Sequence, residues 1–137
     1  MVQEMDRKKV LVIDDEPLIG RVCERLLSPV GFTVKIAQRA DIALEMLNKE
    51  EFDACLLDVR MPGMSGIEFH EHIKESMADF SRKVIFMTGD VLSQRVSDYL
   101  KKNHKLYLVK PFCDDDLVSI VSMVTESSCH TNSKIEA

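Results

Sequence analysis

Four apolar runs of this 137-residue chain each stop at a polar residue of a type that phosphoryl chemistry needs. The polar residues are Asp14 with Asp15, Asp58, Thr88 and Lys110. Continuous apolar runs of this length indicate buried strands, and the carboxyl ends of parallel strands lie side by side at one edge of an open sheet, where ligands bind. We therefore expect three carboxylates, one hydroxyl and one ammonium group in a single crevice.

Carboxylates at such short distances repel one another, by about 1 kcal/mol per pair in water and by several times more when partly desolvated. A hard divalent cation with oxygen ligands offsets that repulsion, and Mg²⁺, or Mn²⁺ in its place, is the common choice beside phosphates. Each residue alone has a plainer explanation. Asp14 and Asp15 suit a helix N-terminus, Asp58 suits a turn, and Lys110 suits a surface strand end. It is the joint pattern that favours a site.

The elements that must position these residues follow from hydrophobic periodicity. Strands are predicted at 9–13, 32–36, 54–57, 83–87 and 106–109, and helices around 17–27, 40–47, 65–73, 91–101 and 117–124. Pro17 suits a first helical turn, and Ser65 with Glu68 has capping-box spacing. Strands alternating with helices indicate an α/β domain, a parallel sheet with helices on both faces.

The composition suits one soluble domain, with 45% hydrophobic and 30% charged residues. We expect a domain over 8–127, a flexible N-terminal segment over 1–7 and a flexible polar tail over 128–137. The net charge of −5 argues against direct nucleic-acid binding. No apolar run approaches the roughly 20 residues of a membrane span, and no signal core begins the chain, so we expect no direct membrane contact and a cytoplasmic location.

The order and spacing of four motifs resemble the receiver domain of two-component response regulators, over about residues 8–127. The motifs are Val10-Leu-Val-Ile-Asp-Asp-Glu16, Leu56-Leu-Asp-Val-Arg-Met-Pro-Gly-Met-Ser-Gly66, Met87-Thr-Gly89 and Lys110-Pro-Phe112. The resemblance implies a doubly wound, flavodoxin-like (βα)5 fold with a five-stranded parallel sheet in strand order 2-1-3-4-5. It also implies Mg²⁺ dependence and phosphorylation of one aspartate by a histidine kinase or a histidine phosphotransfer protein.

Residue roles carry over from the family position by position. Asp58 matches the phosphoacceptor, a carboxylate nucleophile that forms an acyl phosphate. Asp15 and Asp58 would bind the metal directly, Asp14 would hold a metal-bound water, and the backbone carbonyl of Arg60 would supply another oxygen. Lys110 would pair with the phosphoryl oxygens.

The resemblance also implies a switch. Thr88 matches the hydroxyl that moves to the phosphoryl group, and Tyr107 matches the aromatic residue that swings inward with it. Pro111 matches a cis-proline that aims Lys110 into the site. The coupled surface would be the fourth helix, the fifth strand and the last helix, where an unknown downstream protein or a second copy of the chain would bind. Beyond its own phosphorylation and dephosphorylation, no enzyme activity is expected.

Three positions depart from common family choices. Arg60 is long and basic and Asp90 is acidic, so the two would form a phosphoryl gate that hinders water; two solvated loop charges are the simpler explanation. The segment Lys101–His104 stands where many receivers have a small turn, and it resembles the receivers of hybrid histidine kinases.

Four readings stay open at this point. The first is a phosphorylation-controlled signalling domain, either a stand-alone regulator or a receiver segment of a hybrid histidine kinase or other multidomain regulator. The second is a receiver-fold binding module that works without phosphorylation. Such modules usually lack the phosphoacceptor or the lysine, whereas this chain has both Asp58 and Lys110. An aspartate-nucleophile phosphatase would carry Asp-x-Asp and a cap, and a flavodoxin-like electron carrier would need a phosphate loop that the acids at 14–16 would repel.

Overall fold

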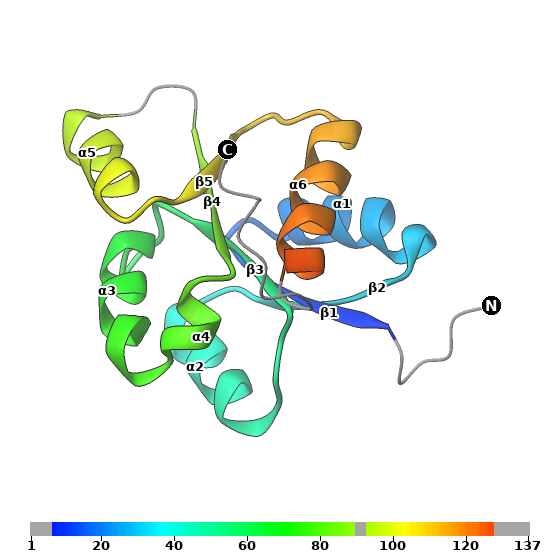
Figure 1. Ribbon diagram of the computed structural model, residues 1–137, viewed down its shortest axis with the longest axis horizontal. Helices are drawn as coiled ribbons and strands as arrows, with labels where there is room; N and C mark the ends of the chain where they lie inside the picture. Colours follow the sequence, from blue (N-terminus) through cyan, green and yellow to red (C-terminus); the bar gives the residue numbers. More distant parts are fainter. Residues whose placement is uncertain (1–6, 90–92, 128–137) are drawn as a thin grey trace.

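The computed structural model describes residues 7–89 and 93–127, which form a five-stranded sheet flanked by helices (Figure 1). The strands are β1 (Lys8–Ile13), β2 (Phe32–Ala37), β3 (Ala54–Asp58), β4 (Val84–Thr88) and β5 (Leu106–Val109). The helices are α1 (Pro17–Leu27), the short 3-10 turn η2 (Ser28–Val30), α2 (Ala40–Lys49), α3 (Gly66–Ser76), α4 (Ala78–Ser81), α5 (Gln94–Lys102) and α6 (Asp114–Ser127).

All neighbouring strands run parallel, in the order β2-β1-β3-β4-β5. The predicted fold class and strand order are therefore confirmed. The order reverses between β1 and β3, and ligands of open α/β sheets bind outside the carboxyl ends of the strands at such a reversal. The fold thus directs attention to the edge of the sheet where β1 and β3 end.

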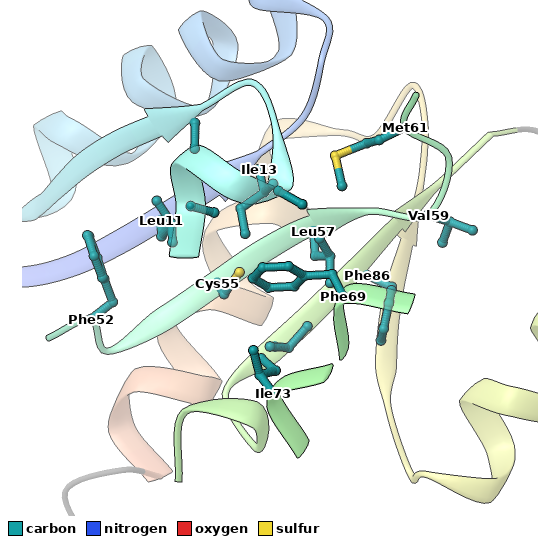
Figure 2. Close-up of a cluster of buried hydrophobic side chains, with 14 of the residues drawn as sticks. Leu11, Ile13, Phe52, Cys55, Leu57, Val59, Met61, Phe69, Ile73 and Phe86 are labelled. Carbon is teal, nitrogen blue, oxygen red and sulfur yellow. The ribbon is translucent and has the colours of Figure 1, made fainter. Parts of the chain in front are cut away.

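Two hydrophobic clusters lie on opposite faces of the sheet. One is made by alternate strand residues such as Leu11, Leu57 and Phe86, and it is covered by α2, α3, α4 and α5 (Figure 2). The other lies under α1 and α6. The residues of β1, β3 and β4 are almost all buried on both sides, which explains why these strands are continuously apolar in sequence.

Local sequence signals set where the helices begin. Pro17 is the first residue of α1, where its missing N–H leaves no hydrogen bond unmade. The predicted capping box forms at α3: the Ser65 hydroxyl accepts from the Glu68 amide, and the Glu68 carboxylate accepts from the Ser65 amide. These caps fix the helix starts nearest to the sheet edge that carries the polar residues.

Three expectations need correction. The described residues form six α-helices rather than five, because the one-turn helix α4 follows α3 without a clear hydrophobic period of its own. The fourth predicted helix begins at Gln94 with Ser93 as its cap, and the expected first residues 91 and 92 lie outside the described part of the chain. Arg7, assigned to a flexible segment, donates hydrogen bonds to Thr33 and to backbone carbonyls on η2 and β2.

The rest of the predicted terminal segments, residues 1–6 and 128–137, lies outside the described residues. Among residues 7–89 and 93–127, none of the helices has the length and apolar character that crossing a bilayer requires.

Candidate functional site

The carboxyl ends of β1, β3, β4 and β5 bring the predicted polar residues to one edge of the sheet. Asp14 and Asp15 directly follow β1, Asp58 and Thr88 are the last residues of β3 and β4, and Lys110 directly follows β5. These strands are consecutive neighbours in the sheet, so residues from distant parts of the sequence become adjacent. The Lys110 amide donates to the Thr88 carbonyl at 2.8 Å, which extends the pairing of β4 and β5 up to the site.

Three carboxylates converge at this edge. One oxygen each from Asp14, Asp15 and Asp58 lies within 4.8 Å of the others. Asp14 is fully buried, Asp58 is 5% exposed, and Asp15 is exposed. This set of hard oxygen donors, open to solvent on the Asp15 side, fits Mg²⁺, which prefers carboxylate oxygen and keeps several waters. The chemistry of the donors therefore agrees with the predicted metal site.

Lys110 neutralises part of this charge. Its Nζ lies 2.9 Å from the Asp14 carboxylate, 3.1 Å from Glu16 and 3.5 Å from Asp58. Burial by itself would lower the pKa of Lys110, because it disfavours the ammonium ion. The neighbouring carboxylates have the larger combined effect, so the pKa of Lys110 is raised. Asp14 also accepts a hydrogen bond from the Glu16 amide at 2.9 Å. In this arrangement the ammonium group is held more closely by Asp14 and Glu16 than by Asp58.

The Asp58 carboxyl group is poorly compensated in the absence of a cation. Burial and the neighbouring charge of Asp14 raise its pKa from 3.8 to about 7, although Lys110 acts in the opposite direction. Its contact with the Arg60 amide is long, at 3.5 Å. Because a carboxylate nucleophile must be ionised, an added positive charge at this edge would be needed for full ionisation near neutral pH.

The loop after β3 holds the site against α3. The Gly66 amide donates to the Val59 carbonyl at 2.9 Å, and a Cβ at Gly66 would lie only 2.2 Å from the Asp58 carbonyl oxygen. Only glycine allows that approach. The Arg60 side chain is exposed, and Asp90 lies outside the described residues, so the predicted gate between them stays a prediction.

The two predicted switch residues differ in their surroundings. Thr88 is 5% exposed at the end of β4, whereas Tyr107 on the edge strand β5 is 43% exposed and faces solvent. The Lys110–Pro111 peptide bond is cis, as the resemblance implies.

Sequence reasoning missed two groups. Glu16 was expected only as an acid at a helix start, yet it contacts Lys110; the run of three acids was the available signal. His70 was considered only as an isolated histidine, but it is buried and contacts Tyr99, 29 residues further along. No local pattern links those two positions, because only the packing of α3 beside α5 brings them together.

With this geometry established, comparisons with known proteins assign the family. Residues 10–122 match the model of the response regulator receiver domain, and the chain belongs to that family. It is 32% identical over 107 residues to chemotaxis protein CheY-3 of Vibrio cholerae, which covers 76% of this chain and 81% of that protein. It is also 28% identical over 140 residues to histidine kinase 2 of Arabidopsis thaliana, covering 87% of this chain and 12% of the kinase.

A solved structure of Vibrio cholerae chemotaxis protein CheY4 superposes with a TM-score of 0.75 at 28% identity, over 86% of this chain and 98% of that one. Six of the curated relatives are much longer, and the chain covers only 12% to 47% of their length. Residues 10–122 of the chain form a receiver domain of two-component signalling. Receiver domains are signalling switches, and they bind Mg²⁺ at an acidic pocket.

Proposed function

We propose that this chain is a phosphorylation-controlled switch that accepts a phosphoryl group on Asp58 with Mg²⁺, or Mn²⁺, at the carboxylate cluster. The observation that carries the proposal is the convergence of Asp14, Asp15 and Asp58 with Lys110 at the strand ends of a receiver domain. The metal would be held by Asp15 and Asp58, by a water on Asp14 and by the Arg60 carbonyl. Once bound, it would neutralise the anionic oxygens that the site collects.

The phosphoryl donor is a phosphohistidine of a histidine kinase or a histidine phosphotransfer protein. The bond between phosphorus and the histidine nitrogen breaks as a bond from phosphorus to an Asp58 oxygen forms. The leaving imidazole keeps the electron pair of the broken bond and takes a proton from solvent. Attack of water on the acyl phosphate later restores the carboxylate and releases inorganic phosphate.

The chain's own residues do the positioning. Asp58 attacks as the ionised carboxylate, which its raised pKa makes dependent on a nearby cation. The Lys110 ammonium, now 2.9 Å from Asp14, has to shift toward Asp58 to meet the transferred oxygens. Fixed positive charge at the developing anion is the main contribution a protein makes to phosphoryl transfer.

The readout uses Thr88 and Tyr107. The Thr88 hydroxyl would donate to the phosphoryl group, and the exposed Tyr107 ring would move inward as Thr88 shifts. The surface formed by α5, β5 and α6 would then change shape, which requires an element with two arrangements. A downstream protein of unknown identity, or a second copy of the chain, would bind there, and we place these events in the cytoplasm.

A second candidate has a specific observation in its favour. The match to histidine kinase 2 of Arabidopsis thaliana covers 12% of that protein, so the same domain occurs within a larger histidine kinase. The chain would then be the receiver segment of a hybrid kinase or another multidomain regulator. The phosphorylation chemistry would be the same, but the output would pass to another part of the same protein or to a phosphotransfer protein.

The test is the intact mass after incubation with acetyl phosphate and Mg²⁺. We expect one added phosphoryl group on the wild type, none after chelation of the metal and none on Asp58→Asn. Asp79→Asn is the control, because Asp79 is highly exposed and precedes β4 at the opposite sheet edge. An unmodified wild type, in a reaction that modifies a known receiver, would favour the binding module that works without phosphorylation.

A further inference from the structure

Helix α5 is held to the rest of the domain by very few apolar residues. Leu100 is its one buried residue, and Val96 and Tyr99 are only partly buried against the core cluster of that face. Side-chain hydrogen bonds that join the α5 region to α3 run from Tyr99 to His70 and from Lys74 to Asn103. The placement of α5 therefore depends partly on these polar contacts with α3.

The central contact is a buried polar pair. His70 is 3% exposed, and its Nδ1 lies 2.6 Å from the Tyr99 hydroxyl oxygen. Burial, followed by the charge of Lys105, lowers the pKa of His70 to about 4, and burial raises the pKa of Tyr99. At neutral pH the imidazole is therefore uncharged, and the contact joins two neutral side chains. A hydrogen bond with Glu71 also raises the pKa of Tyr99.

Strand β4 takes part in the same contact. The Phe86 ring meets the His70 ring edge to face, with centroids 5.5 Å apart, and meets the Tyr99 ring at 6.3 Å. Phe86 precedes Thr88 by two residues, so both side chains project from the same face of β4. A shift of the strand end that carries the switch hydroxyl would reach both rings through Phe86.

Helix α3 connects the pair to the phosphoacceptor. Gly66, its first residue, lies against the Asp58 carbonyl, and His70 follows one turn later on the buried side of the helix. The pair is thus connected to two elements at the site: to α3, which begins there and carries His70, and to β4, which ends there and carries Phe86. It also contacts the helix that forms one side of the proposed output surface, α5.

We propose that His70 and Tyr99 are positioning residues that couple the state of Asp58 to the position of α5. Their hydrogen bond holds α5 in the arrangement seen here, and phosphorylation changes that contact through α3 and β4. The inference rests on the proposed function, because it needs a phosphoryl group on Asp58. It adds a second route to the output surface, which runs through α3 and Phe86 to α5 and does not pass through Tyr107.

The test measures backbone amide exchange in α5 with and without acetyl phosphate and Mg²⁺, with the intact mass of the same sample as the record of phosphorylation. Tyr99→Phe removes the hydroxyl and keeps the ring, and His70→Leu removes the ring nitrogen that the hydroxyl contacts. In the unphosphorylated protein, both should exchange α5 amides roughly two- to tenfold faster, the range expected for one hydrogen bond. His72→Gln, on the exposed side of the same helix, is the control and should behave as wild type.

The decisive quantity is the ratio of α5 exchange rates between the phosphorylated and unphosphorylated protein. We expect phosphorylation to change α5 exchange in the wild type, and this response to be lost in Tyr99→Phe and in His70→Leu. It should be kept in His70→Asn, whose amide group can take the place of Nδ1. If the two residues had a purely structural role, their replacement would speed α5 amide exchange equally in the phosphorylated and unphosphorylated forms. The ratio of the two exchange rates would then equal that of the wild type.

Two results would overturn the proposal while leaving the phosphorylation of Asp58 intact. One is a phosphorylated wild type with no response in α5. The other is a wild-type ratio in both Tyr99→Phe and His70→Leu. A wild type that takes up no phosphoryl group would overturn this inference together with the function on which it rests.

Discussion

Replacing Asp58 by asparagine should stabilise the metal-free protein near pH 8, although the same change abolishes the proposed phosphorylation. The wild-type carboxyl group is almost fully buried, and its charge lies close to that of Asp14. At an effective dielectric constant of 20, two charges at most 4.8 Å apart repel by at least about 3 kcal/mol. Lys110 offsets part of this repulsion, and the neutral amide removes it.

The magnitude follows from the pKa. At about 1.4 kcal/mol per pH unit, the rise from 3.8 to about 7 corresponds to about 4 kcal/mol. Local rearrangement and the shared interaction with Lys110 reduce this, so we expect about 2–4 kcal/mol. The folded protein keeps the Asp58 proton up to about pH 7, whereas the unfolded chain loses it near pH 4. The wild type therefore loses stability relative to Asp58→Asn as the pH rises from about 4 to 7.

Urea unfolding followed by circular dichroism, with a chelator present and at several pH values from 4 to 8, measures the difference. We expect Asp58→Asn to exceed the wild type by less than about 1 kcal/mol at pH 4 and by the full amount above pH 7. Asp15→Asn is the matched control, because Asp15 is exposed and removing its charge should change stability little. Added Mg²⁺ should stabilise the wild type, by about 2.7 kcal/mol at one hundred times its dissociation constant, and not Asp58→Asn. Equal stability of the two proteins at pH 8, or a difference that does not depend on pH, would refute the electrostatic reasoning.

Three further predictions concern the surroundings of the site. Gly66→Ala should destabilise the protein by about 2–3 kcal/mol, because its Cβ would lie 2.2 Å from a backbone oxygen at the end of β3. Gly89→Ala, with open space around its Cβ, should stay near the wild type, and thermal melts of the wild type and the two variants measure both effects. Lys110→Met should cost about 3 kcal/mol without metal, since it leaves the buried Asp14 charge without its cation, and a urea midpoint equal to that of the wild type would contradict this. The pKa of His70 lies near 4 in the folded protein against an ordinary value of 6.5, so the contribution of this group should fall by about 2–3 kcal/mol as the pH falls from 6.5 to 4, opposite in sign to the contribution of Asp58 over the same range. His70→Asn should lack that loss in chemical unfolding series across this range, and a parallel pH dependence of the two proteins would count against a buried neutral imidazole.

Much of this fold follows from local patterns in the sequence. Strands that are apolar on both faces, together with caps such as Ser65 with Glu68, lie within a few residues of where periodicity predicts them. The convergence of Asp14 and Asp58 also follows, because parallel strands must place their carboxyl ends at one edge. Helix α4 was missed because four residues carry no helical period.

The finer features of the site depend on tertiary packing. The preference of Lys110 for Asp14 and Glu16 over Asp58 is a matter of tenths of an ångström that no spacing encodes. The contact of His70 with Tyr99 joins α3 and α5, which are separated in the chain by α4 and β4. Residue types predict which groups meet at the edge of the sheet, but the distances between them come only from the folded structure.

The measurement that tests the central claim most directly is the location of the phosphoryl group. Borohydride reduces an aspartyl phosphate to homoserine, which marks the modified residue permanently for peptide mass mapping. After treatment with acetyl phosphate and Mg²⁺, we predict homoserine at position 58 alone, and none when the metal is chelated. Homoserine at position 14 or 15, or a phosphorylated protein without homoserine at 58, would contradict the assignment of Asp58 as the phosphoacceptor.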